Sequence, residues 1–367
     1  MAKNILIATA ILFTFSCAPK DKPQDTAKPL SWFKGNTHVH TTLCGHADTQ
    51  PDTVATWYLD RGYNFLILSE HNLFIDPATV NLPAGRREDF ILIPGEEVTD
   101  FAAIHTTAMN INRLVKAQRQ ETDEMPEFST SEYSNAKVYL MQKHTDSIKR
   151  AGGIAILNHP NFVSGAAASY IRDVNGLEMM ELHNGHPDVY NWGNDKHASM
   201  EQKWDSLLTA GRRVYGVSSD DAHSFKKWAP DVSNPGRGWV MVQSESLTPD
   251  AITAAMQQGK FYSSSGVMLA EIAIESDQYK IVVDESTTYK EIESPFVIGY
   301  KLQENEEGFI IEFVSENGEV LQSTEGLAAS FPINKASKYL RAKVTYSRNR
   351  GNASEQFFAW SQPVFLP

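Results

Sequence analysis

The sequence predicts an α/β barrel followed by a smaller antiparallel β domain, and three observations lead to this prediction. From about Ser31 to Gly266, short apolar runs alternate with amphipathic segments, a pattern typical of a parallel sheet covered by helices. Metal-binding residue types follow several of these apolar runs, and side chains at the carboxyl ends of many strands converge when a sheet closes on itself. From about Val267, period-two segments replace the alternation.

The first region contains the candidate strands and helices of the barrel, predicted over residues 31–266. Three helices end on a glycine, at Gly152, Gly211 and Gly259, and glycine commonly ends a helix because it accepts the left-handed conformation. The candidate strands are residues 32–38, 63–68, 90–93, 104–111, 154–157, 177–182, 214–217 and 239–242, and the candidate helices are residues 51–61, 138–151, 200–210 and 249–258.

The remaining residues, 267–367, carry the signals of an antiparallel sheet. Apolar and polar residues alternate over 270–274, 309–314 and 339–346, as in strands with one buried face. The run Glu316-Asn317-Gly318-Glu319 predicts a hairpin turn, because Asn-Gly accepts positive φ angles. We therefore predict a small C-terminal β domain.

The N-terminus has the features of an export signal. Lys3 precedes an apolar run, Ile5 to Phe15, that is too short to span a bilayer as a helix. Cys17 lies where a bacterial lipoprotein signal places its lipidated cysteine, and residues 18–30 form a polar linker. We predict a signal peptide over residues 1–17 and a lipid anchor in the bacterial cell envelope, at the periplasm or outer membrane. The alternative is an ordinary signal peptide cut nearby.

Composition limits the partners of the protein. The 367 residues carry a formal net charge of -12 and are 41% hydrophobic, which suits an ordinary globular protein and argues against binding to a nucleic-acid duplex. A membrane is expected as a partner only through the lipid at Cys17. Cys44 has no internal disulfide partner unless Cys17 stays free. It is either a soft metal ligand or a buried neighbour of His40 and His46. The sequence does not predict the oligomeric state.

Seven of the eleven histidines, together with Glu97 and Asp221, lie in short motifs, most of them at the ends of predicted strands. Imidazole and carboxylate are the usual ligands of catalytic divalent metals, and nine such groups exceed the needs of one ion. His38 and His40 are two residues apart on a strand, so they point the same way. A lone histidine is more often a core or surface residue, but that explanation does not account for the whole set. The candidate ligands are His38, His40, His46, His71, Glu97, His105, His159, Asp221 and His223, of which His105 lies inside an apolar run.

Taken together, these motifs resemble those of the polymerase and histidinol phosphatase (PHP) superfamily, and more narrowly the branch that includes carbaryl hydrolase. The resemblance covers about residues 31–266 and implies a distorted seven-stranded β/α barrel, TIM-like in plan, that holds two or three Zn, Mn or Fe ions. It also implies hydrolysis, most often of phosphate esters. The motifs are His38-Val39-His40, His46, Ser69-Glu70-His71-Asn72, Pro94-Gly95-Glu96-Glu97, His105, Asn158-His159-Pro160, Asp221-Ala222-His223 and the run Gly259 to Gly266.

The resemblance also implies how the ligands divide among three metals. The first metal would be held by His38, His40, Glu97 and Asp221, the second by Glu97, His105 and His159, and the third by His46, His71 and His223. Glu96 competes with Glu97, and Asp220 with Asp221, but the motif spacing favours Glu97 and Asp221. The family usually has Asp where this chain has Glu70, and the extra methylene would shift His71 and weaken the third site.

The predicted function is metal-dependent hydrolysis of a small phosphomonoester or phosphodiester. A hydroxide between the metals would attack phosphorus, with Glu97 and Asp221 as bridging carboxylates. Arg237 would bind the phosphate or a carboxylate, unless it forms a structural ion pair. His183, or its neighbours Asn184 and His186, would protonate the leaving group, unless these residues only shape their loop. One alternative is a carbamate or carboxylic ester hydrolase on the same metal centre. Another is an inactive surface lipoprotein that binds glycan.

Overall fold

The computed structural model describes residues 29–86, 88–122, 133–163, 165–302, 306–350 and 353–366. The predicted signal peptide, Cys17 and most of the predicted linker lie outside these residues, so export and lipid anchoring stay predictions. Across the described ranges, none of the helices has the length and apolar character needed to cross a membrane.

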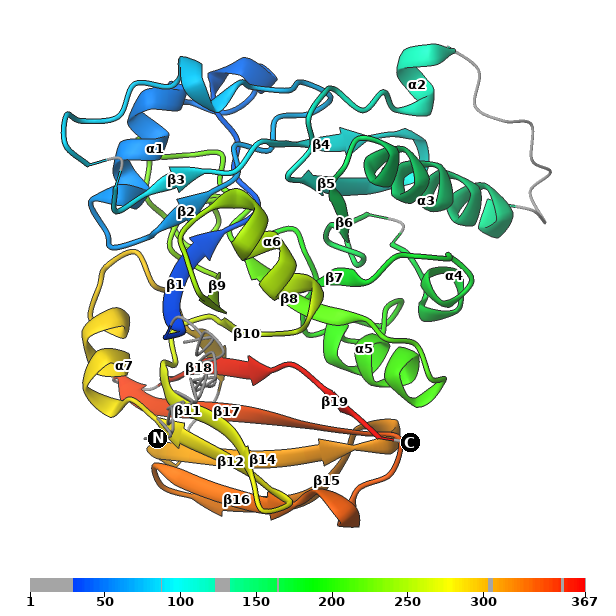
Figure 1. Cartoon of the computed structure of the whole chain (residues 1–367). Helices are drawn as coiled ribbons and strands as arrows, with labels where there is room; N and C mark the ends of the chain where they lie inside the picture. The colour runs from blue at the N-terminus through cyan, green and yellow to red at the C-terminus, as the bar shows by residue number, and fades with distance from the viewer. Residues whose placement is uncertain are drawn as a thin grey trace, which may run out of the picture.

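The strands up to residue 219 divide between two sheets (Figure 1). In the larger sheet, β1, β2 and β3 run parallel side by side. In the second, β4, β5 and β6 pair antiparallel, and β6, β7 and β8 pair parallel. The bounds are β1 (Ser31–Asn36), β2 (Phe65–Leu66), β3 (Ile91–Leu92), β4 (Gly95–Thr99), β5 (His105–Met109), β6 (Ile154–Leu157), β7 (Met179–Asn184) and β8 (Tyr215–Ser219).

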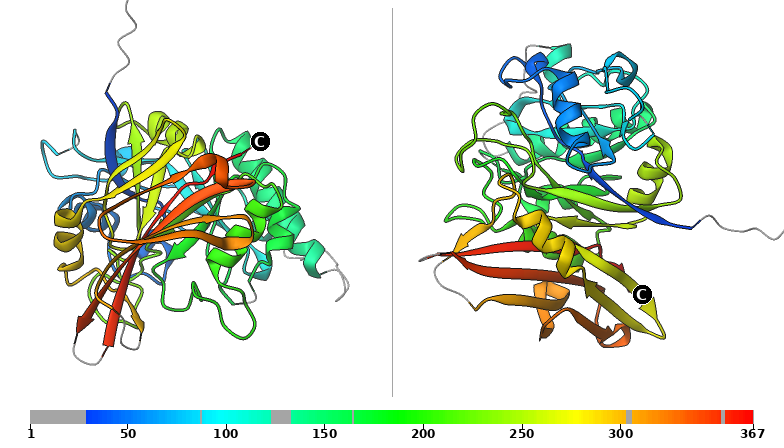
Figure 2. Two further views of the ribbon diagram at one scale, coloured as in Figure 1. Left: turned by 90° about the horizontal axis from the view of Figure 1, so that it is seen from below. Right: turned by 90° about the vertical axis from the view of Figure 1, so that its left-hand side faces the viewer.

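The larger sheet continues from β1 into the C-terminal region without a break. β9 pairs antiparallel with β1, β10 with β9, and β18 with β10. A further sheet of three strands, β11, β12 and β16, lies in the C-terminal region (Figure 2). The bounds are β9 (Trp239–Ser244), β10 (Phe261–Ser264), β11 (Leu269–Glu275), β12 (Gln278–Val283), β13 (Tyr300–Leu302), β14 (Gly308–Ser315), β15 (Glu319–Glu325), β16 (Ala328–Pro332), β17 (Tyr339–Arg350), β18 (Ala353–Ser361) and β19 (Val364–Phe365).

The predicted closed seven-stranded β/α barrel is wrong. The described strands form sheets of eleven, five and three strands, and the largest runs along an open path from β3 to β15. A β/α barrel needs a parallel partner on each side of each strand, but β1 has antiparallel β9 on one side. The alternation of apolar runs with amphipathic segments in the sequence predicts where strands occur. It does not predict which strands pair with one another, and the barrel prediction depended on that pairing.

Helices cover the outer face of the five-stranded sheet. α3, α4 and α5 lie along it on one side of the molecule, and α6 packs against β9 (Figure 1). At the start of α5, the Ser199 hydroxyl accepts from the Gln202 N–H while the Gln202 side chain accepts from the Ser199 N–H, a capping box that satisfies two free donors. The helices are α1 (Pro51–Leu59), α2 (Gln118–Glu121), α3 (Tyr133–Arg150), α4 (Ala168–Arg172), α5 (Met200–Thr209), α6 (Pro249–Gln257) and α7 (Glu285–Ile292), and α2, α4 and α7 were not predicted.

An apolar core lies between the two larger sheets. Its side chains come from strands of both, so burying them holds the sheets together. A second core joins β1, β2 and β9 to the C-terminal strands. The side chains of the first core include Phe65, Ile67, Met109, Ile156, Met179, Val217, Val240 and Val242.

A buried ion pair docks α5 onto the C-terminal strand β17. The Arg341 guanidinium donates from Nε and Nη2 to the two Asp205 oxygens, at 2.8 and 2.7 Å, and the Tyr339 hydroxyl donates to the same carboxylate at 2.8 Å. Arg341 is only 1% exposed. Burial by itself would lower the pKa of Arg341. The carboxylates of Asp205 and Glu201 raise it by more, so the pKa lies above its usual value. The charge is therefore kept inside the protein by its partners.

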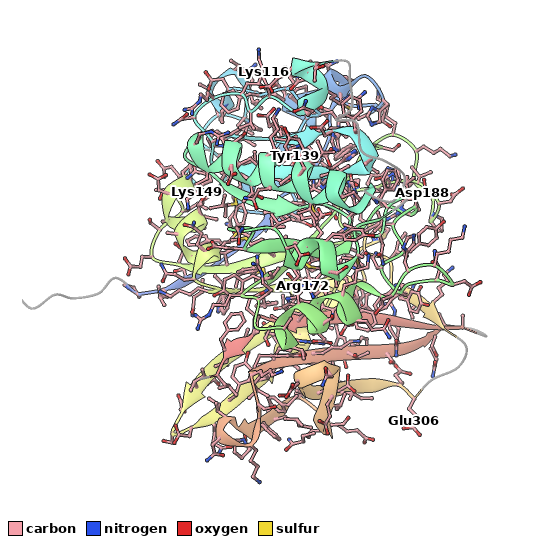
Figure 3. All side chains as sticks on the ribbon, turned by 90° about the vertical axis from the view of Figure 1, so that its right-hand side faces the viewer. Lys116, Tyr139, Lys149, Arg172, Asp188 and Glu306 are labelled. Atoms are coloured by element: carbon pink, nitrogen blue, oxygen red, sulfur yellow. The ribbon has the colours of Figure 1, made fainter. Side chains whose placement is uncertain are left out.

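Replacing Asp205 with Ala is expected to destabilise the protein by about 3–5 kcal/mol, because the buried Arg341 charge loses its main partner. Chemical denaturation of the purified protein measures this change. Arg172→Ala is the matched control, since Arg172 pairs with Asp173 on the surface and lies on the side covered by α3 and α4 (Figure 3). This control should leave the denaturation midpoint unchanged. Equal effects of the two substitutions would contradict the structural role of the ion pair.

Candidate metal centre

Short backbone bridges join the two larger sheets where β1, β2 and β8 end. Val39 pairs with Ala222, and His71 pairs with Glu97. The Asp221 N–H donates to the His38 carbonyl at 2.9 Å, which ties the end of β8 to the end of β1. The side chains that follow these strands therefore converge, although the sheets do not close into a barrel.

Glu97 lies at the middle of the converging side chains. Its oxygens are 3.3 Å from His38 Nε2, 2.5 Å from His71 Nδ1, 3.2 Å from His105 Nδ1 and 3.3 Å from His159 Nε2. Burial acts to raise the pKa of Glu97, but the surrounding histidines lower it well below its usual value. With His40 Nε2 at 3.6 Å as well, Glu97 is a fully buried carboxylate shared by five imidazoles, which favour its ionised form. It belongs to β4, which the sequence did not predict as a strand.

Asp221 is the second shared carboxylate. Its Oδ1 lies 3.2 Å from His38 Nε2 and 3.3 Å from His40 Nε2, and its Oδ2 lies 3.9 Å from His159 Nε2. Asp221 has a φ of 49° and His159 a φ of 26°. A left-handed backbone costs a residue with a side chain about 1–3 kcal/mol. Two strained residues on neighbouring loops are common at functional sites, where the surrounding structure holds a side chain in place.

Glu181 was not predicted as part of the site, and it orients one of the histidines. The His38 Nδ1–H donates to Glu181 Oε1 at 2.8 Å, which leaves the His38 Nε2 lone pair free to face the centre. The other oxygen, Oε2, accepts from the His159 backbone N–H at 2.6 Å and from Asn184 Nδ2 at 2.8 Å. Glu178, just before β7, is exposed, whereas Glu181 within β7 is buried. Residues three apart on an extended chain point to opposite faces, which offers a signal that only one of the two glutamates faces inward.

A second group of imidazoles adjoins the first. His40, His71 and His223 place one ring nitrogen each within 4.8 Å of the others. His46 Nε2 lies 3.3 Å from His71 Nε2, and the His46 ring stacks on His223 with centroids 4.7 Å apart. Cys44 belongs to a further group with His46 and His223, so both expectations for its thiol stay open.

The separations between these atoms match those of ligands on one ion. A tetrahedral ion bound at 2.0–2.2 Å holds its ligand atoms about 3.3–3.6 Å apart. The corresponding separations are 3.1 Å between His38 Nε2 and His40 Nε2, 3.3 Å from Glu97 Oε1 to His38 Nε2, and 3.6 Å from Glu97 Oε2 to His40 Nε2. The buried Nδ1 atom of His159 has no hydrogen-bond partner among the described residues, and that of His105 has only the Glu97 carboxylate beside it, at 3.2 Å. These buried groups could hold a metal ion.

The two competing carboxylates have other partners. Glu96 Oε1 accepts from the Val115 N–H at 2.5 Å, and burial raises the pKa of Glu96 to about 7. Asp220 accepts from the backbone N–H groups of residues 236–238 and from the Tyr58 hydroxyl, and burial raises the pKa of Asp220 to about 6. Glu96 therefore points away from the histidines that contact Glu97. Asp220 holds the loop at residues 236–238 through its hydrogen bonds.

Glu70 lies on the Nδ1 side of the His40 ring, whereas the Nε2 atom of that ring faces Glu97 and Asp221. Its Oε1 accepts from the Thr41 N–H at 2.7 Å, and its Oε2 lies 4.0 Å from His40 Nδ1. The His71 ring is held independently, because its Nδ1 lies 2.6 Å from the Thr99 hydroxyl and 2.5 Å from Glu97. The structure therefore gives no sign that the longer Glu70 side chain displaces His71.

Arg237 and His183, the other two predicted catalytic residues, lie outside the cluster. Arg237 Nη2 donates to the Ala229 carbonyl at 2.7 Å and to Asn234 Oδ1 at 2.9 Å. The His183 Nε2–H donates to the Arg237 carbonyl at 3.1 Å, and its ring stacks on Trp360. Burial lowers the pKa of His183 to about 4, so its ring is neutral. Both side chains support the loops beside the centre, and their roles in catalysis stay predictions.

A cleft of about 430 Å³ gives access to the cluster. His186 and Phe162 line it together with several candidate ligands, and Asp188 lies at its exposed rim, at one edge of the molecule (Figure 3). The cleft is walled by the candidate ligands His46, His71, His105, His159, Asp221 and His223. A small molecule in this cleft would therefore touch the metal ligands directly.

Glu181→Gln is expected to weaken metal binding about 10–100-fold, because residues that orient a ligating histidine contribute affinity of this order. Equilibrium dialysis against Zn²⁺ or Mn²⁺ measures the loss. Glu178→Gln, three residues earlier and exposed, is the matched control and should bind metal like the wild type. A Glu181→Gln protein with wild-type affinity would show that Glu181 does not orient a ligand.

Metal affinity is expected to rise with pH through the neutral range. Burial lowers the pKa of His38, His71 and His159, but neighbouring carboxylates raise it by more, so each pKa lies above its usual value. These raised values mean that protons compete with cations for the rings, and binding releases protons. Titration calorimetry in buffers of different ionisation enthalpy counts the protons released. Proton uptake on binding would contradict this prediction.

Comparison with protein-family models and with curated proteins finds no match for this chain. The assignment of a function therefore depends on the chemistry of the cluster and on the sequence motifs.

Proposed function

We propose that this protein is a metal-dependent phosphoesterase that hydrolyses a small phosphomonoester or phosphodiester. The observation that supports the proposal is the convergence of six imidazoles on two buried carboxylates, Glu97 and Asp221, at the base of a cleft, with His46 beside them. Buried ionised groups in this number are costly unless they are paired or bind cations. A purely structural cluster would have no need to line a cleft that admits a substrate.

The cluster suits two or three divalent ions. Imidazoles with shared carboxylates favour Zn, Fe or Mn. Divalent cations held close together generate a hydroxide nucleophile from water at neutral pH and offset the charge that develops on phosphoryl oxygens. His38, His40, Glu97 and Asp221 would hold one ion, and His105 and His159 would share Glu97 with a second. His46, His71 and His223 would hold a third.

The residues of the chain would orient the ester and supply protons. Hydrolysis joins a water oxygen to phosphorus, breaks the bond from phosphorus to the alcohol oxygen, and delivers a proton to that oxygen. His186 Nδ1 accepts from the Asp188 N–H at 3.1 Å, so the proton of its neutral ring is on Nε2. His186 lines the cleft, and this N–H would donate a hydrogen bond to the alcohol oxygen or to a phosphoryl oxygen.

The proposal extends to family and location. The order of the histidine and carboxylate motifs supports membership of the PHP superfamily, although the sheets do not form the expected barrel. Residues 1–17 support export and a lipid anchor at Cys17 in the cell envelope. The substrate would then be a small phosphorylated molecule outside the cytoplasm.

Glu97→Gln is expected to lower phosphatase activity about 10³-fold and to reduce bound metal, since it removes the charge shared by five histidines. The assay is hydrolysis of nitrophenyl phosphate by protein reconstituted with Mn²⁺ or Zn²⁺, a comparison that reports transition-state stabilisation. Glu96→Gln is the adjacent isosteric control. Its side-chain oxygen can still accept from the Val115 N–H, so its activity should stay near the wild-type value.

The same preparation separates the competing functions. Hydrolysis of naphthyl carbamate without hydrolysis of nitrophenyl phosphate would replace the proposal with a carbamate or carboxylic ester hydrolase. Fewer than two equivalents of metal per chain, with no activity on either ester after adding Mn²⁺ or Zn²⁺, would exclude hydrolysis. The inactive glycan-binding lipoprotein would then be the better hypothesis.

A further inference from the structure

A second pocket, which we call the side pocket, adjoins the metal cleft. It has a volume of about 210 Å³ and shares His186 with the cleft. Its walls come from the loop after β7, the loop before β9 and the C-terminal region, which contributes Tyr300 and Phe358. Whole ligand sites usually measure about 300–1,000 Å³. The side pocket is thus sized for one part of a molecule whose other part lies in the metal cleft.

One wall of the side pocket is aromatic. Trp192 contacts Tyr300 with ring centroids 4.4 Å apart and Phe358 with centroids 4.8 Å apart. Pro187 and Ile298 add apolar surface. Such a wall favours a ring-shaped group that packs by its face.

Two polar residues of the pocket lining, His183 and Arg237, each have one buried side-chain atom without a hydrogen-bond partner among the described residues. The His183 Nε2–H donates to the Arg237 carbonyl, so His183 Nδ1 is an acceptor, and it has no donor within reach. Arg237 Nε is a donor without an acceptor. The other side-chain amides of the wall, Asn184 and Asn191, are fully engaged with the backbone, Glu181 and each other. Both atoms are buried, so a ligand would reach them only after a small shift of these side chains. A hydroxyl group, which both donates and accepts, would then suit either atom.

The charges of the pocket exclude other occupants. No Asp or Glu side chain belongs to its described lining, so a cationic group would find no partner there. Arg237 gives its Nη2 hydrogens to Ala229 and Asn234, which reduces its capacity for a second phosphate. An uncharged group therefore fits best.

We infer that the side pocket binds the alcohol part of the substrate, and that this part is an uncharged ring bearing hydroxyl groups, as in a sugar phosphate. The inference rests on the proposed phosphoesterase function, which places the phosphate in the metal cleft. His186 lines both the metal cleft and the side pocket. With the phosphate in the cleft and the ring in the side pocket, His186 would lie beside the ester bond that joins them. The C-terminal region selects the substrate, since it supplies part of the aromatic wall.

The test compares glucose 6-phosphate, glycerol 3-phosphate and AMP as substrates of the full-length, metal-loaded protein. Glucose 6-phosphate should have the highest kcat/KM. Tyr300→Ala should raise its KM about tenfold, the effect of losing one stacking contact worth near 1.4 kcal/mol, and should leave KM for glycerol 3-phosphate unchanged. Tyr289→Ala is the matched control, because Tyr289 and Tyr300 are each 38% exposed and Tyr289 lies outside the pocket.

A binding measurement keeps the inference separate from the proposed function. Glucose 6-phosphate should change the tryptophan fluorescence of the wild type but not of Trp192→Phe. If no ester is hydrolysed, the phosphoesterase proposal fails, and fluorescence alone decides whether the pocket binds a sugar. A preference for glycerol 3-phosphate, whose alcohol part has no ring, or equal effects of Tyr300→Ala on all three esters, would overturn the inference while leaving the phosphoesterase intact.

Discussion

The burial of three ionised carboxylates in one small volume is the constraint on which the rest of the centre depends. Glu97, Asp221 and Glu181 are each at most 5% exposed, and uncompensated charges in such a place would cost several kcal/mol each. The imidazoles offset this cost by donating hydrogen bonds or by binding cations together with the carboxylates. Because Glu97 and Asp221 each touch several histidines, the cluster is one coupled unit, and its members would titrate and bind metal together.

The position of the cluster follows from how the sheets meet. Two single β-bridges join the separate sheets, one between Val39 and Ala222 and one between His71 and Glu97. The backbone beside each bridge therefore does not continue into a longer run of paired residues. The loops after β6 and β8 are therefore free to adopt the left-handed conformations at His159 and Asp221 that aim these side chains inward. The apolar core shared by the two sheets lies beneath the bridges and supplies the rigidity that such strained positions need.

The sequence predicted much of the local structure and little of the pairing. Strand 154–157 and the helices near 51–61 and 200–210 were placed within a few residues, because their periodicity is set by local burial. β4 was missed, since Glu96 and Glu97 interrupt its apolar character. The closed barrel was wrong because pairing of β9 with β1 depends on contacts distant in sequence. Candidate ligands could be found from residue type and strand-end position, whereas Glu181 could be assigned only once β7 was seen beside His38.

The C-terminal region is coupled to the centre through the same sheet. β10 pairs with β9 on one side and with β18 on the other, and Phe358 of β18 reaches the wall beside the metal cleft. Asp220, next to the ligand Asp221, fixes the loop at residues 236–238 that carries Arg237. A change in the C-terminal strands would therefore reach the ligands through continuous hydrogen bonding. The C-terminal strands are thus continuous with the sheet that contains β1 and β2.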